Sequence, residues 1–262
     1  MTKTSERVSK YHEAMNRSLV EQASQVRLAI DYAGNNVNGA SEGNNGQLVP
    51  MPFYNGAAAR VARSKAIRRL AEQLAPLAVL ESSVRLLISG CRPGDGASTV
   101  AAALAIDLSQ RLGLRTICVD AHLRHPSLHR TFLAPGSRTP ELMLDGSLQI
   151  RATEWPRLDL ATCCPVSTDE ERMQQLADFE GLLNRYPAAV VDLGVPRLDA
   201  RMLPLARPND PILLVVRQGY TERSELATTS AGLRAANRPV AGVVLNSATT
   251  SVAKPLRRLL GS

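Results

Sequence analysis

One stretch organises the predicted fold of this chain: residues 84–132 read VRLLISGCRPGDGASTVAAALAIDLSQRLGLRTICVDAHLRHPSLHRTF. Its first residues form an apolar run with the composition of a buried strand, and a glycine-rich turn and a helix-periodic segment over 99–112 follow. Strand, glycine turn and helix in this order are typical of a phosphate-binding loop. Gly94 and Gly96 let successive backbone N–H groups converge on an anion, and the helix adds its positive dipole end.

The loop departs from the usual phosphate-binding pattern at one position. That pattern ends Gly-Lys-Ser/Thr, with the last hydroxyl on magnesium, whereas here Gly96 is followed by Ala97 and Ser98. Alanine cannot place the positive charge that the lysine brings to the β- and γ-phosphates. Losing one charge-assisted contact of about 1.5–3 kcal/mol weakens nucleotide binding by roughly 10- to 100-fold. Phosphoryl transfer should suffer more, because the lysine also stabilises charge that develops in the transition state.

Composition indicates a globular, cytoplasmic chain. It has 262 residues, of which 44% are hydrophobic and 21% charged, with no apolar run of membrane-spanning length and no apolar signal core at the N-terminus. The formal charge is +7, yet only 3% of the residues are aromatic and the basic residues are scattered among acids, which argues against nucleic acid as a partner. The four cysteines lack a disulfide or zinc spacing, and we expect them to be reduced.

Two regions follow from the pattern along the chain. Residues 1–55 contain helical spacing over 5–33 and a polar, glycine- and asparagine-rich run over 34–47, which predict an amphipathic helix and a flexible linker. The helix either docks on a partner or forms a loosely held appendage. Residues 56–262 form the predicted domain.

This domain alternates helices with apolar strands. Helices are expected at 58–74, 99–112, 173–186 and 222–236, and strands at 84–89, 115–120, 158–163, 188–192, 211–216 and 240–245. A turn-rich stretch containing Pro135, Gly136, Pro140 and Gly146 separates the second strand from the third. We therefore predict an α/β fold with a mostly parallel sheet covered by helices on both faces.

Two of the predicted strands end in an acid. Asp120 and Asp192 should both lie at the carboxyl edge of the sheet, where ligands of such folds bind, near the loop. Carboxylates there suit a hard cation held through oxygen and water. The alternative is that each acid caps a helix or turn.

Four motifs in order resemble the bacterial tyrosine autokinases of capsule and exopolysaccharide synthesis, within the wider deviant-Walker class of septum-positioning and plasmid-partition ATPases. The resemblance spans residues 64–248 and implies a P-loop NTPase-like, three-layer sandwich. Family members carry P-G-x-G-K-S-T, D-A-D-x-R-x-P, D-x-P-P and G-V-V-L-N. Here the corresponding segments are Pro93-Gly94-Asp95-Gly96-Ala97-Ser98-Thr99, Asp120-Ala121-His122-Leu123-Arg124-His125-Pro126, Val191-Asp192-Leu193-Gly194 and Gly242-Val243-Val244-Leu245-Asn246.

The resemblance also implies residue roles. ATP or ADP with magnesium would be held by the loop residues Arg92, Gly94, Asp95, Gly96, Ala97, Ser98 and Thr99. Ser98, Asp120 and Asp192 would coordinate the magnesium ion, the two acids would act in catalysis, and Asn246 would contact adenine. Asn246 could equally be a turn residue that closes its strand.

The departures from the family pattern form a consistent set. Ala97 replaces the loop lysine, and His122 replaces the second aspartate of the second motif. In the third motif, D-x-P-P, Leu193 and Gly194 stand in place of the x and the first proline. The family's ring-assembly pattern E-x-x-R-x-x-R aligns with Lys65, Arg68 and Ala71, and residues 251–262 contain no tyrosine that could stand for the family's C-terminal acceptor cluster. Arg92 lies where partition ATPases place their signature lysine, so it either supplies the missing charge to a nucleotide-sandwiching homodimer or is a solvated loop arginine.

These observations lead to one main hypothesis and two alternatives. The main one is a degenerate kinase-like protein in exopolysaccharide synthesis or export, with weak or regulatory nucleotide binding, that docks on the cytoplasmic segment of an inner-membrane polysaccharide co-polymerase. The alternatives are an active ATPase or tyrosine kinase that uses Arg92, and a positioning ATPase. The last would contact the membrane peripherally through the basic tail 252–262, although packing of the tail on the domain is the simpler expectation.

Overall fold

The computed structural model describes residues 27–29, 57–80, 83–122, 126, 128–132, 142–145, 148–164, 166–196, 203–204, 206–207, 210–238 and 240–247. Its helices and strands, in chain order, are β1 (Arg27–Ala29), α2 (Ala57–Ala62), α3 (Lys65–Leu80), β2 (Val84–Gly90), α4 (Ala97–Gln110), β3 (Thr116–Asp120), α5 (Leu128–Phe132), β4 (Leu142–Asp145), β5 (Leu148–Ala152), β6 (Leu158–Cys163), α6 (Asp169–Leu183), β7 (Ala188–Asp192), β8 (Ile212–Arg217), α7 (Arg223–Ala235) and β9 (Val240–Asn246).

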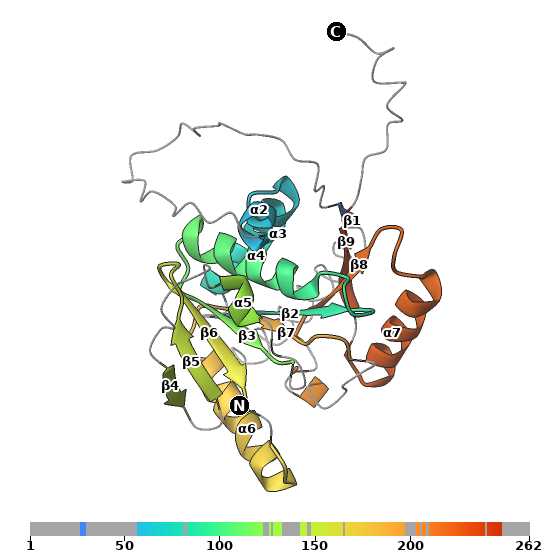
Figure 1. Ribbon diagram of the computed structural model, residues 1–262. Helices are drawn as coiled ribbons and strands as arrows, with labels where there is room; N and C mark the ends of the chain where they lie inside the picture. Colours follow the sequence, from blue (N-terminus) through green and yellow to red (C-terminus); the bar gives the residue numbers. More distant parts are fainter. Residues whose placement is uncertain are drawn as a thin grey trace, which may run out of the picture.

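The described strands form one sheet in the order β1-β9-β8-β2-β7-β3-β6-β5-β4 (Figure 1). Every pairing from β1 to β6 is parallel, and β5 and β4 add an antiparallel hairpin at one edge. Strand β2, which leads into the glycine loop, is central and is buried along its whole length. Parallel strands need helical crossovers, so their carboxyl ends, and the loops that leave them, all meet at one edge of the sheet.

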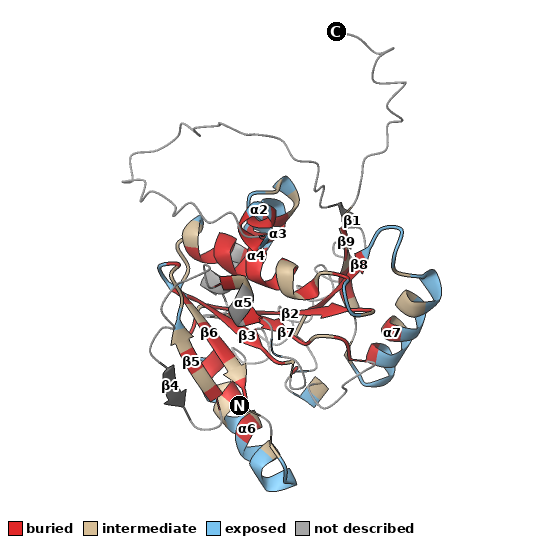
Figure 2. Cartoon of the chain, in the orientation of Figure 1, coloured by how far each residue is buried: buried red, intermediate tan, exposed pale blue. Residues whose placement is uncertain are grey.

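Helices cover both faces of the sheet, which confirms the predicted three-layer α/β fold (Figures 1 and 2). One core cluster joins α2, α3, α4 and α5 to one face, with Leu86 and Ile88 of β2 pointing into it. A second cluster joins α6 and α7 to the other face, into which Leu87 points. The alternation along β2 is the two-residue period of a strand. Helix α4 is buried almost all round, because α2 and α3 pack on the side away from the sheet.

Most predicted elements are confirmed, with β6 and β7 at their predicted bounds. The predicted helix 58–74 is two helices, separated by a turn at residues 63–64, and α3 continues to Leu80. Helix α6 begins at Asp169 rather than at 173 and ends at Leu183 rather than at 186. Its earlier start follows from a capping box, in which Thr168 and Glu171 satisfy each other's backbone N–H groups.

Two predictions about local structure were wrong. The turn-rich stretch contains strands β4 and β5, which pair with each other antiparallel. Residues 27–29, expected within the helix 5–33, form strand β1 beside β9, where backbone pairing outweighs a helical pattern. The remainder of that helix, the linker 34–47 and the tail 252–262 lie outside the described residues. Among those that are described, no helix is long and apolar enough to cross a membrane.

Candidate nucleotide site at the carboxyl edge of the sheet

The glycine loop joins β2 to α4, and its backbone conformation is the one that an anion-binding loop requires. Gly94 and Gly96 both have φ of +91°, a left-handed conformation that favours glycine. Gly96 is the N-cap of α4, no side chain caps the helix there, and the first helical hydrogen bond runs from the Val100 N–H to the Gly96 C=O (3.0 Å). The N–H groups of the first three helical residues, 97–99, precede that bond and are the groups that an anion would accept from.

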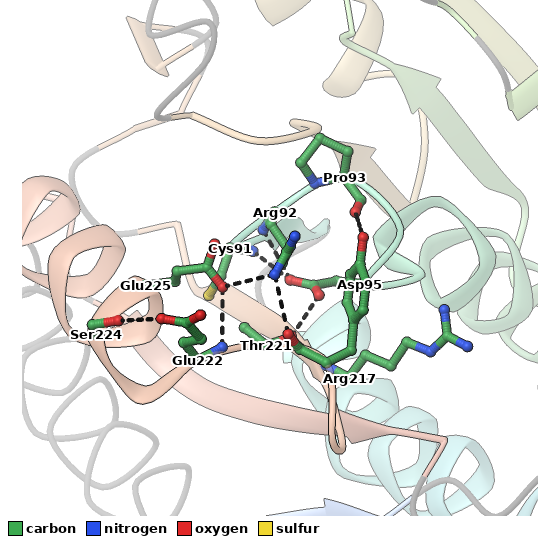
Figure 3. A network of polar contacts seen from close by, with 10 residues as sticks. Cys91, Arg92, Pro93, Asp95, Arg217, Thr221, Glu222, Ser224 and Glu225 are labelled. Atoms are coloured by element: carbon green, nitrogen blue, oxygen red, sulfur yellow. Dashed lines mark hydrogen bonds and ion pairs between the residues drawn. The ribbon is translucent and has the colours of Figure 1, made fainter.

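The Asp95 side chain turns back into the loop. Oδ2 accepts the N–H groups of Cys91 and Arg92, each at 2.9 Å, and Oδ1 accepts the Thr221 hydroxyl at 2.5 Å (Figure 3). Asp95 is 1% exposed, and its N–H donates to the Arg92 C=O (3.3 Å). Asp95 was predicted to contact the nucleotide, and in the structure its side chain stabilises the loop through these hydrogen bonds.

Arg92 is held within its own chain by the loop between β8 and α7. Its guanidinium carbon lies 4.2 Å from the centroid of the Tyr220 ring, Nη1 donates to the Tyr220 C=O at 3.2 Å, and the same nitrogen lies 3.6 Å from Glu225 Oε2 (Figure 3). The Tyr220 hydroxyl in turn donates to the Pro93 C=O at 3.1 Å. Arg92 would have to leave these contacts before it could reach a phosphate in this chain or in a second copy.

Asp120 and Asp192 lie side by side at the sheet edge. They are register partners on β3 and β7, and each is 1% exposed. Asp120 accepts the N–H groups of His122 (3.2 Å) and of Leu128 (2.9 Å), the first residue of α5, so it performs the capping role that was the alternative to magnesium binding. Both carboxylates nonetheless lie at the carboxyl ends of neighbouring parallel strands, the place that the strand pattern predicted.

Asp192 is the acid that faces the helix α4. It accepts the Gly194 N–H at 3.0 Å and the side chain of Ser98. Its pKa is raised from 3.8 to about 6, mainly by burial and also by the charge of Asp120, while the hydrogen bonds from Ser98 and Gly194 act in the opposite direction. Ser98 and Asp192 are thus in contact, as two ligands of one magnesium ion would be, and the donor set fits a hard cation.

Asn246 reaches the loop from the end of β9. Its Nδ2 donates to the Asp95 C=O at 2.7 Å, and its Oδ1 accepts the Ser247 N–H at 2.9 Å. A Cβ at Gly96 would lie 2.2 Å from that Nδ2, so the amide fits only against a glycine. Asn246 is 4% exposed, and its amide, which was predicted to contact adenine, donates to the loop backbone.

Two departures from the family pattern also touch each other. The imidazole of His122 packs on Gly194, where a Cβ would lie 2.6 Å from His122 Cδ2 and where φ is +64°.

The three ring-assembly positions differ in exposure. Ala71 is fully buried in the core, whereas Lys65 and Arg68 are exposed on α3. An arginine at position 71 would therefore point into the core and could not reach solvent.

Sequence reasoning missed the contribution of the loop between β8 and α7. Thr221 and Tyr220 of this loop, and Glu225 in the first turn of α7, contact the glycine loop, although more than 120 residues separate them from it. The pairing of β8 with β2 brings them there. No local pattern marks them, although the place of residues 218–221 directly after a predicted parallel strand put them at the correct edge.

A glycine loop at a helix start, followed by two strand-end acids on neighbouring parallel strands, defines the class: the chain has the P-loop NTPase fold. No family model matches the chain. The tyrosine-protein kinase YwqD of Bacillus subtilis (strain 168) is 26% identical over 171 residues, which cover 62% of this chain and 71% of YwqD.

Solved structures show the same likeness. The kinase domain of the Escherichia coli tyrosine kinase ETK matches with a TM-score of 0.58 and 20% identity, over 72% of this chain and 77% of the domain. The BceF tyrosine kinase domain matches with a TM-score of 0.55 and 23% identity, over 70% and 76%. The resemblance to bacterial tyrosine kinases predicted from the four motifs is thereby confirmed.

Proposed function

We propose that this chain is a kinase-like regulatory protein of exopolysaccharide or capsule synthesis, which binds nucleotide weakly and transfers phosphoryl groups poorly if at all. The observation that carries the proposal is an open, uncapped anion-binding loop whose first helical residue is Ala97. The site keeps the parts that bind phosphate and magnesium and lacks the charge that a transferred phosphoryl group needs.

Binding is supported by the geometry of the loop and of the acids. The backbone N–H groups of residues 97–99 lie at the N-terminus of α4, which is the positive end of the helix dipole, and they are available to an anion. Ser98 also contacts Asp192 there. Magnesium bound there would neutralise part of the phosphate charge. Ser98 and Asp192 would hold and orient that ion.

Poor transfer is supported by two separate features. Ala97 is buried and carries no charge, and the only cation of the described loop, Arg92, is held by Tyr220 and Glu225. In the transition state, negative charge spreads over the γ-phosphoryl oxygens. Backbone dipoles and magnesium would stabilise that charge, but no loop lysine would contribute.

The partner comes from the resemblance. Kinases of this family work with an inner-membrane polysaccharide co-polymerase, and we propose that its cytoplasmic segment docks on this fold at the inner face of the membrane. Purified protein mixed with that segment should form a complex and acquire no robust phosphotyrosine. Robust phosphotyrosine with Mg-ATP would contradict the proposal of a regulatory, transfer-deficient protein.

A calorimetric titration with Mg-ATP and Mg-ADP tests nucleotide binding. The natural protein should bind in the micromolar range, and Ala97→Lys should bind about 10- to 100-fold more tightly, because the variant restores one charge-assisted contact. Met173→Lys is the matched control, since it adds the same charge at an exposed position of α6. Equal affinity of the natural protein and Ala97→Lys, or binding by neither, would contradict the proposed nucleotide site.

The alternative of an active enzyme predicts a different pattern. If Arg92 replaced the lysine, ATP turnover would be measurable and would collapse in Arg92→Ala and in Asp192→Asn. The contacts of Arg92 with Tyr220 and Glu225 favour the regulatory reading, since turnover would first have to break them.

A further inference from the structure

Asp95 is the charged residue of the glycine loop whose side chain is buried within the fold. Its carboxylate receives two backbone N–H groups from its own loop and one hydroxyl from the loop between β8 and α7. Its backbone C=O receives the amide of Asn246 from the end of β9. Three chain segments that are far apart in sequence therefore meet at Asp95.

Burial of this side chain is costly unless its oxygens are hydrogen-bonded. A carboxylate loses several kcal/mol of hydration on burial, and only strong donors offset that loss. Asp95 has three donors on its two oxygens, so the loss is offset only in the loop shape that brings all three together. The loop shape and the burial of Asp95 thus stabilise each other.

The outer partners of Asp95 are themselves oriented by the fold. The Thr221 oxygen accepts the Arg217 N–H at 2.8 Å, which leaves its hydroxyl hydrogen free to point at Asp95. The Asn246 amide is fixed by the Ser247 N–H on its oxygen and by close packing of its nitrogen on Gly96. Neither side chain depends on a ligand for its position.

We propose that Thr221 and Asn246 are positioning residues for polyphosphate: acting through Asp95, they hold the glycine loop in its anion-binding shape before any ligand arrives. A loop that is already ordered loses little conformational entropy when phosphate binds, so part of the affinity lost with the lysine is retained. The inference rests on the proposed nucleotide binding, but the ordering of the loop is a property of the unliganded protein.

Thr221→Val gives the sharpest test because it removes the hydroxyl and keeps the shape. Thr221→Ser restores the hydroxyl, and Thr228→Val makes the same change on the exposed face of α7. Two measurements are made on the full chain: hydrogen exchange of the backbone amides of residues 91–97, Pro93 excepted, without ligand, and calorimetric titration with Mg-ADP and with magnesium pyrophosphate.

The expected result is faster exchange of the loop amides in Thr221→Val by about 10- to 100-fold, the equivalent of one hydrogen bond to a charged group. Affinity for both Mg-ADP and pyrophosphate should fall by a similar factor, since the change acts on the loop and not on the base. Thr221→Ser and Thr228→Val should behave as the natural protein does. Asn246→Ala should affect the loop in the same direction.

Unchanged exchange at residues 91–97 in both Thr221→Val and Asn246→Ala would overturn the inference. So would a loss of Mg-ADP affinity in Asn246→Ala that pyrophosphate does not share, because that result assigns Asn246 to the base. If the natural protein binds neither ligand, the proposed function fails, whereas the exchange comparison, made without ligand, still decides whether these residues order the loop.

Discussion

Single residues of the candidate site divide into those that sequence motifs identify and those that only contacts explain. Gly96 was singled out as a flexible loop glycine, and the structure adds that its missing Cβ makes room for the Asn246 amide. Asp192 was singled out as a strand-end acid, and burial next to Asp120 gives it an altered pKa. In both cases the sequence motif identified the residue, but only the structure shows which residue it contacts.

The close approach at Gly96 predicts a large penalty for a methyl group. Gly96→Ala would force alanine into φ of +91° and place its Cβ 2.2 Å from Asn246 Nδ2. The left-handed backbone costs about 1–2 kcal/mol and the displaced hydrogen bond about 1 kcal/mol, so the free energy of unfolding should fall by roughly 2–3 kcal/mol. Urea denaturation measures this. Gly232→Ala on α7, where a Cβ meets nothing within 4 Å, should instead stabilise the protein by about 0.5–1 kcal/mol.

The raised pKa of Asp192 predicts how stability varies with pH. Its carboxyl has a pKa of 3.8 when unfolded and about 6 when folded, so its protonated form favours the fold below pH 4 and that contribution is lost as pH rises through 6. Asp192→Asn cannot ionise. The unfolding free energy of the natural protein should therefore fall relative to Asp192→Asn by roughly 2 kcal/mol between pH 4 and pH 7, measured by urea denaturation at each pH. A difference that stays constant with pH would contradict the assignment.

At the level of elements, periodicity and turn residues explain most of what was predictable. The strands of the parallel part were found because both faces are buried and they read as apolar runs. The hairpin of β4 and β5 was missed although Gly146-Ser147, a glycine-first pair typical of hairpin connections, stands between the two strands in the sequence. The start of α6 was placed late although Thr168 and Glu171 form a recognisable capping box.

A polar network ties β2 to α6 below the site, and it predicts an asymmetry between its members. Arg85, with a side chain 4% exposed, donates to both Glu180 oxygens at 2.9 and 3.0 Å and to Asn184 Oδ1 at 2.8 Å. Glu180→Ala leaves a buried cation and should lower the unfolding free energy by about 3 kcal/mol, whereas Arg85→Met removes the charge and should cost clearly less. Chemical denaturation of both variants checks this.

An exposed ion pair provides the matched control for that network. Glu72, with a side chain 57% exposed, contacts Arg111 at 2.9 Å on the surface of α3 and α4. Glu72→Ala should cost less than about 1 kcal/mol, because solvent screens the pair. If Glu180→Ala were as mild as Glu72→Ala, the buried network would not contribute to the packing of α6 on β2.

For the whole molecule, the predicted boundary at residue 56 can be tested by truncation. A chain of residues 56–262 retains every described element except β1, so it should fold, with circular dichroism close to that of the full chain. Loss of β1 leaves the outer edge of β9 unpaired, so the fragment should be less stable and more prone to self-association in light scattering. Failure to fold would show that residues before 56 belong to the domain.

The architecture and the identity of the loop could be read from the linear pattern because each is local. A buried strand, a glycine turn and a helix lie within about 30 consecutive residues, and apolar runs alternate with helices along the rest of the domain. The absence of the loop lysine is likewise a fact of one position, Ala97.

What required the folded chain is everything that joins distant segments. The pairing of β2 with β8 and of β8 with β9 brings Thr221 and Asn246 to Asp95 and Tyr220 to Arg92. The pairing of β3 with β7 sets Asp192 beside Asp120. These contacts depend on strand order and register, which no sequence period encodes, because the two-residue period of a strand tells which face a side chain occupies and not which strand lies next to it.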